Sequence, residues 1–129
     1  PGETDKLFTE SANFVREMPV TYLHVFRYSP RSGTDSEGYS NPVPATAARQ
    51  RSQEMITIGL QKKDQFLKSQ LGRTGEVLFE SRMKNGGFTG FSRNYIKVGC
   101  EGIPGSNIVS QINLERKSGM TLMGSIATN

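Results

Sequence analysis

The chain has 129 residues, of which 34% are hydrophobic, and its 16 basic and 12 acidic side chains give a net charge of +4. This length allows one ordinary domain or two small ones. The single cysteine, Cys100, excludes an internal disulfide, and together with the single histidine, His24, it excludes the usual cysteine or multi-histidine metal site. No apolar run approaches the ~18 residues of a membrane span. We therefore expect a cytoplasmic chain without membrane contact or a metal of its own.

The first part of the chain predicts a helix, a strand, a loop and a second helix. The chain begins with Pro1-Gly2-Glu3-Thr4 and runs at once into a helical pattern over about 4–18, so we expect it to be cut from a larger protein. Residues 20–28 are β-branched and aromatic, which predicts a strand covered on both faces. Residues 29–44 are rich in proline, glycine and serine and predict a loop, and a helical pattern returns over 45 to about 67. Helix followed by strand is half of a βα repeat, so we interpret residues 1–67 as an α/β segment with a closing helix.

From residue 73 the pattern changes to short β-rich runs separated by glycines. It predicts five strands, at 75–82, 88–92, 95–100, 108–116 and 120–127. The sequences Asn85-Gly86-Gly87 and Lys117-Ser118-Gly119 are expected hairpin turns. Five short antiparallel strands predict a small closed, OB-like barrel over residues 68–129, because closure removes exposed strand edges. The expected class is therefore α+β, with two parts.

The positive charge is concentrated in the second part. Residues 1–67 hold eight basic and eight acidic side chains, whereas residues 68–129 hold eight basic and four acidic ones. Basic and aromatic residues are interleaved there: Arg82, Lys84, Phe88, Phe91, Arg93, Tyr95 and Lys97. Cations can follow a phosphate backbone while rings stack on unpaired bases, which predicts RNA binding. The alternative is that Phe88 and Phe91 fill the barrel core and the cations are ordinary solvated surface.

The segment that follows the expected strand at 20–28 holds a second group of candidates, Tyr28, Arg31 and Thr34. Loops at this edge of α/β barrels face ligands, and an arginine can bind a carboxylate or phosphate there. The alternative is a simple turn in which side-chain hydroxyls bond the backbone. His24 is expected to be a packed core residue and Cys100 a buried thiol.

Several short motifs occur in a specific order: Pro1-Gly2-Glu3-Thr4, Tyr22-Leu23-His24-Val25-Phe26, Tyr28-Ser29-Pro30-Arg31, Gly33-Thr34, Gly90 and Asn94-Tyr95-Ile96-Lys97-Val98. With them the chain resembles, over its whole length, the C-terminal portion of the radical S-adenosylmethionine methylthiotransferases. Its last part looks like the RNA-binding TRAM barrel of that family. The wording around His24 is most similar to the enzymes that methylthiolate N6-threonylcarbamoyladenosine beside the tRNA anticodon. Related enzymes act on isopentenyladenosine, and one branch acts on a ribosomal protein.

The resemblance implies that residues 1–67 are the C-terminal piece of the radical S-adenosylmethionine α/β barrel of a parent enzyme. It also implies that this enzyme uses S-adenosylmethionine and two 4Fe-4S clusters, one of them held by a three-cysteine motif. This chain has no such motif, so we expect it to be inactive alone and to contribute tRNA binding, with Tyr28, Arg31 and Thr34 near the substrate mouth. One alternative is a barrel that binds protein, as the ribosomal-protein branch implies. Another is a barrel that only caps the catalytic domain through the helix at 55–67.

Overall fold

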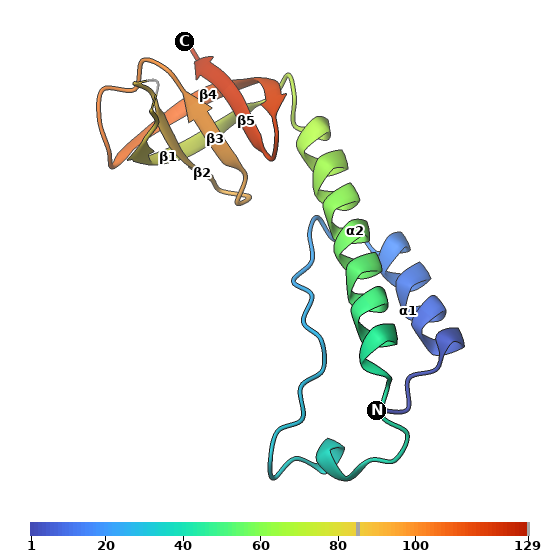
Figure 1. The fold of residues 1–129 in the computed structure, drawn as a ribbon. Coiled ribbons are helices and arrows are strands. Elements are labelled where there is room, and N and C mark those ends of the chain that lie inside the picture. Colours follow the sequence, from blue (N-terminus) through green and yellow to red (C-terminus); the bar gives the residue numbers. More distant parts are fainter. Residues whose placement is uncertain (85, 129) are drawn as a thin grey trace. The chain divides into compact units, whose positions relative to one another are not determined.

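The computed structural model describes residues 1–84 and 86–128. These residues form two α-helices, a short 3-10 helix and five strands (Figure 1). The chain divides into two compact units, Pro1–Lys63 and Asp64–Asn129. In the described ranges, no helix combines the length and the apolar character that crossing a bilayer requires.

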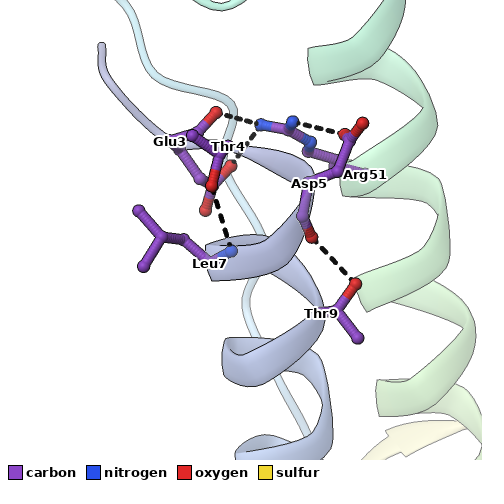
Figure 2. Close-up of polar contacts among 6 residues, drawn as sticks. All are labelled: Glu3, Thr4, Asp5, Leu7, Thr9 and Arg51. Atoms are coloured by element: carbon purple, nitrogen blue, oxygen red, sulfur yellow. Dashed lines mark hydrogen bonds and ion pairs between the residues drawn. The ribbon is translucent and has the colours of Figure 1, made fainter.

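The first helix, α1, spans Asp5–Glu17 and confirms the helix predicted from residue 4 to 18. The side chain of Thr4 caps it by accepting a hydrogen bond from the backbone N–H of Leu7, with the two atoms 3.3 Å apart (Figure 2). Asp5 in its first turn and Arg16 in its last turn have the charges that the helix dipole favours. Local sequence therefore accounts for both ends of α1.

The second helix, α2, spans Ala45–Ser69 and confirms the second predicted helix. The loop before it contains only the 3-10 helix η1, Asp35–Gly38, as the composition of residues 29–44 indicated. Within the first unit, ion pairs and hydrogen bonds join α2 to α1. Arg16 Nη2 lies 2.8 Å from Glu54 Oε1, and Lys62 Nζ donates to the carbonyl oxygens of Arg16 and Met18 at the end of α1.

Arg51 of α2 holds the start of α1 (Figure 2). Its guanidinium donates to the backbone carbonyl and the carboxylate of Glu3, both at 2.9 Å, and to Asp5 Oδ1 at 2.7 Å. The guanidinium also lies 5.6 Å from the centre of the Phe8 ring. The bond to Asp5 is the main cause of a raised Arg51 pKa. One side chain thus joins the Pro1-Gly2-Glu3-Thr4 motif to the second helix.

The strand predicted over residues 20–28 is wrong, because this segment is irregular in the structure. A strand needs a neighbour to receive its backbone hydrogen bonds, and no strand of the described residues pairs with it. The expected burial on both faces is also wrong, since Phe26 is 87% exposed and His24, expected in a packed core, is exposed. The segment packs on α2 through Leu23, whose Cβ would lie 3.1 Å from a Cβ placed on Gly59.

The second unit is a closed five-stranded barrel, which confirms the predicted architecture. Its strands are β1 Thr74–Arg82, β2 Phe88–Ser92, β3 Lys97–Cys100, β4 Ile108–Ser118 and β5 Thr121–Ile126, and they lie in the ring order β1-β2-β3-β5-β4 (Figure 1). Four of the pairings are antiparallel, but β3 and β5 are parallel, so the expectation of antiparallel pairing throughout is wrong. The reason is parity, because strand directions cannot alternate completely around a closed ring of five.

The barrel core consists of alternate residues of its strands, including Val77, Phe79, Val98, Ile112 and Leu122, all fully buried. Leu67, from the end of α2 that belongs to this unit, is buried in the same cluster. At β2 the strands approach so closely that a Cβ on Gly90 would overlap the carbonyl oxygen of Leu78. Gly90 faces a bulge in β1, between Phe79 and Ser81, and its lack of a side chain permits that bulge.

The hairpin between β4 and β5 turns at Gly119-Met120, and Gly119 has a φ of 58°, as expected for a glycine in the predicted Lys117-Ser118-Gly119 turn. In the other predicted turn, Gly86 also has a positive φ, of 96°. Asn85, the first residue predicted for that turn, lies outside the described residues.

Candidate nucleic-acid interface

The outer surface of β1, β2 and β3 carries a ring and a cation on neighbouring strands. Phe91 of β2 is directly opposite Lys97 of β3, and directly opposite residues point to the same face of a sheet. Their neighbours along the strands, Ser92 and Val98, are buried, so Phe91 and Lys97 face solvent. Phe91 is 47% exposed, although an aromatic ring in a small barrel is more often part of the core.

Tyr95 lies in the turn between β2 and β3 and presents its ring to solvent, with 80% of the residue exposed. Its φ is 60°, in the left-handed region that tyrosine rarely adopts. The turn is held by the Tyr95 N–H donating to the Ser92 carbonyl at 2.9 Å and by a hydrogen bond from the Ile96 N–H to Ser92 Oγ at 3.1 Å. An exposed ring on a strained backbone is typical of a functional position.

The four predicted cations differ in their surroundings. Arg93 Nε lies 2.7 Å from Glu76 Oε1, so this guanidinium is paired, although an exposed ion pair contributes at most about 1 kcal/mol and exchanges readily. Lys97 has no acidic partner among the residues that the structure describes. Phe91 and Lys97 are opposite each other on β2 and β3, and Arg93 and Tyr95 lie in the turn that joins these two strands, so all four residues belong to the same end of this strand pair.

Arg82, Lys84 and Phe88 lie elsewhere. Phe88 is half-buried and packs against the core, in agreement with the alternative in which this ring fills the barrel. Arg82 is opposite Phe88 and so shares its side of the sheet, the side that Phe91 does not use. Arg82 and Lys84 are exposed at the end of β1, where they form a separate basic end of the barrel.

Two exposed apolar residues of this surface were not among the sequence candidates. Leu78 of β1 is opposite Phe91, and on the other side of β1 it is opposite Val109 of β4. Leu78 lies between the buried Val77 and Phe79, and Val109 lies between two half-buried residues, so the alternation marks both as outward-facing. Their position beside Phe91 depends on strand register, which the sequence does not reveal.

The candidates of the first unit, Tyr28, Arg31 and Thr34, are all exposed. The Thr34 hydroxyl donates to the Arg31 carbonyl at 2.8 Å and the Tyr28 hydroxyl donates to Ser36 Oγ at 3.1 Å, which is the hydrogen bonding that a simple turn would have. Tyr28 also lines a groove of about 380 Å³ with apolar residues of both helices. The Arg31 guanidinium makes no ion pair with the described part of the chain.

The residues of this chain do not fit an iron-sulfur cluster, which needs several cysteine ligands. Cys100 is the one cysteine of the sequence, and it is buried as predicted. Burial is the main cause of a raised pKa of its thiol, and the negative charges of Glu115 and Glu101 raise this pKa further. Over residues 1–84 and 86–128 no three histidine, cysteine or acidic side chains gather as metal ligands would. His24 contacts Tyr22 edge-on, with ring centres 5.3 Å apart.

The fold and this surface define a class of chain in which a helical unit leads into a small closed barrel with an exposed basic and aromatic face. No family model matches the chain. Sequence comparison finds relatives that are named as tRNA-modifying enzymes. A tRNA-2-methylthio-N(6)-dimethylallyladenosine synthase from Bartonella quintana is 28% identical over 98% of the chain. The enzyme of the same name from Lachnoclostridium phytofermentans is 31% identical over 96% of the chain, and a threonylcarbamoyladenosine tRNA methylthiotransferase from Bacillus subtilis is 30% identical over 79%.

The chain belongs to the radical S-adenosylmethionine methylthiotransferase family, as its motifs indicated. It spans only 24% to 28% of the length of these three relatives. Both the dimethylallyladenosine and the threonylcarbamoyladenosine enzymes occur among them at similar identity.

Proposed function

We propose that the barrel is the tRNA-binding portion of a longer methylthiotransferase that adds a methylthio group to a modified adenosine next to the anticodon. The observation that supports this most is the solvent-facing pair of Phe91 and Lys97, with the exposed ring of Tyr95 in the adjoining turn. The names of the related enzymes point to tRNA as well. The threonylcarbamoyladenosine enzymes remain our choice because of the motif around His24.

Each side chain has a defined part in this proposal. Lys97 binds a phosphate, while Phe91 and Tyr95 stack on unpaired bases. Arg93 exchanges Glu76 for a second phosphate, and Arg82 and Lys84 contact the backbone farther along the RNA. Binding in this way gives affinity and orientation, whereas the chemistry belongs to other parts of the parent enzyme.

The parent enzyme would work in the cytoplasm with S-adenosylmethionine and two 4Fe-4S clusters. The present chain supplies no cysteine set for either cluster, so it is inactive alone. In the parent, Tyr28, Arg31 and Thr34 would lie near the substrate mouth and contact the modified adenosine or its neighbours.

The test is a titration of the chain with unmodified tRNA at several salt concentrations. Replacing Arg82, Lys84 and Lys97 together by glutamine should weaken binding, and each lost phosphate contact should reduce the slope of log affinity against log salt by about 0.7 to 0.9. The control replaces Lys6, Arg27 and Arg49 of the first unit by glutamine, which removes the same charge. Equal loss in both triple variants would contradict the proposal, because it would show attraction by net charge alone.

A protein-binding barrel is the second candidate, because Leu78 and Val109 are exposed apolar residues. Such a barrel should bind a ribosomal protein with weak salt dependence and should bind tRNA no better than other polyanions. Tight, salt-sensitive binding of tRNA by the wild-type chain would exclude this candidate.

A further inference from the structure

An apolar band crosses the outer surface of the barrel and ends at a cation. We call it the outer stripe, and it consists of one residue from each of four adjacent strands: Val109, Leu78, Phe91 and Lys97. Val109, Leu78 and Phe91 are 56%, 41% and 47% exposed. Because neighbouring strands lie about 4.8 Å apart, the stripe is about 14 Å long.

The charges beside the outer stripe favour phosphate at one end only. Lys97 lies at the β3 end, and Glu76, two residues before Leu78, is already paired with Arg93. Glu80 is the extra residue of the bulge in β1, so a carboxylate lies two residues beyond Leu78. A polyanion that crossed the middle of the stripe would meet this carboxylate, whereas a nucleotide with its phosphate at Lys97 places an uncharged base over Phe91 and Leu78.

The width of the outer stripe disfavours the other common occupants of an exposed apolar surface, the protein partner considered above among them. A stable interface with protein buries about 800 Å² on each partner, which is much more than a single row of three apolar side chains can provide. Duplex RNA keeps its base faces stacked inside the helix and would offer this row only sugars and phosphates. Unpaired bases have flat apolar faces that fit a narrow band of rings and aliphatic side chains.

We propose that the outer stripe binds consecutive unpaired nucleotides, with one phosphate at Lys97 and bases on Phe91, Leu78 and Val109. This inference rests on the proposed function, and it names the class of RNA segment that the barrel takes. Leu78 and Val109 then contribute to affinity through apolar contact with bases, and the barrel prefers a loop or a single-stranded tail to a stem.

The experiment measures fluorescence anisotropy with the complete chain and three probes: an unstructured single-stranded RNA, the same RNA paired with its complement, and unmodified tRNA. Leu78→Ser and Val109→Ser should each weaken binding of the single strand and of tRNA by roughly three- to tenfold, because each variant loses apolar contact with a base. The slope of affinity against salt should stay unchanged in both, because neither variant loses a phosphate contact. The matched control is Met120→Ser, an exposed apolar residue in the turn between β4 and β5.

The possible results separate the two proposals. If the wild-type chain binds tRNA but Leu78→Ser and Val109→Ser bind like the control, the outer stripe is overturned and the proposed function stands. If the wild-type chain binds no RNA even at low salt, the proposed function fails first. Equal affinity for duplex and single-stranded RNA would also contradict the proposal that the outer stripe binds unpaired nucleotides. So would a dimer in sedimentation experiments that Leu78→Ser dissociates, because the stripe would then be an interface between two copies of the chain. Val109 is the more exposed of the two positions, so Val109→Ser keeps the test valid if Leu78→Ser unfolds.

Discussion

Tyr95 combines an unfavourable backbone with an exposed ring, and these two features can be separated by substitution. Its φ of 60° places the backbone in the left-handed region, which costs a residue with a Cβ about 1–2 kcal/mol. Glycine avoids that cost but loses about 0.5–1 kcal/mol more conformational freedom on folding than alanine does. We therefore expect Tyr95→Gly to be more stable than Tyr95→Ala by about 0.5–1 kcal/mol.

The sign of this difference is the informative quantity, because glycine is less stable than alanine at most positions. The free energies of unfolding come from urea titrations followed by circular dichroism, with the slope of each titration checked for equality. Arg93 is the control, since it lies in the same turn without a positive φ, and there the alanine variant should be the more stable one. If Tyr95→Gly is less stable than Tyr95→Ala, the backbone of residue 95 is not strained by its positive φ, and the prediction is refuted.

The same two variants test the ring. Both lack it, so both should bind tRNA about tenfold more weakly than the wild type, as expected when one base loses its stacking partner. The two variants should have equal affinity for tRNA, although their stabilities differ. Wild-type affinity in both would remove Tyr95 from the proposed interface and leave the strain unexplained.

Two further predictions concern the barrel itself. Gly90→Ala should lower the free energy of unfolding by about 3 kcal/mol or more, because the new methyl group would overlap the Leu78 carbonyl. The control is Gly75→Ala, which should change this free energy little, because the new Cβ would lie 3.8 Å from the nearest atom. Urea titration measures both variants, and similar effects would contradict the close approach of the strands at Gly90. Asp64 is bonded to Lys68 and Lys117 at 2.7 and 2.9 Å, and these bonds lower its carboxyl pKa below the ordinary 3.8. The stabilisation relative to Asp64→Asn should therefore be constant above that ordinary value and disappear as the pH falls through the lowered pKa, and a difference that persists in acid would contradict it.

Helices were predictable from the sequence because their signals are local. Thr4 can cap a helix, the apolar spacing follows it directly, and Pro19 cannot continue a helix. All three signals lie within one short segment, and the structure places α1 at Asp5–Glu17 accordingly. The strand predicted at 20–28 failed because a strand also needs a partner, which the pattern of its own residues cannot supply. Arg51 illustrates a different limit, since nothing around it in the sequence marks the contacts that it makes with Glu3 and Asp5.

The candidate interface was predictable in residue type but not in arrangement. The alternation of side chains along β2 and β3 is compatible with Phe91 and Lys97 facing outward. It does not predict that Phe88 packs against the core or that Leu78 lies beside Phe91. Those outcomes depend on register and on the bulge in β1, which are properties of strand pairs. Composition identified the region of the chain where cations and rings are interleaved, and strand pairing decided which of these side chains meet solvent together.

The register of β3 links the barrel core to its outer surface. Because side chains alternate along a strand, a shift of one residue would turn Lys97 inward and Val98 outward. Val98 is fully buried, and a lysine in its place would leave an unpaired charge in the core, so the core strongly disfavours the shifted register. The turn at Ser92 and Ile96 fixes the start of β3 through its hydrogen bonds, and pairing with β5 fixes its other side. The outward position of Lys97 is therefore a consequence of core packing, and the surface can vary in sequence without losing this geometry as long as Val98 remains apolar.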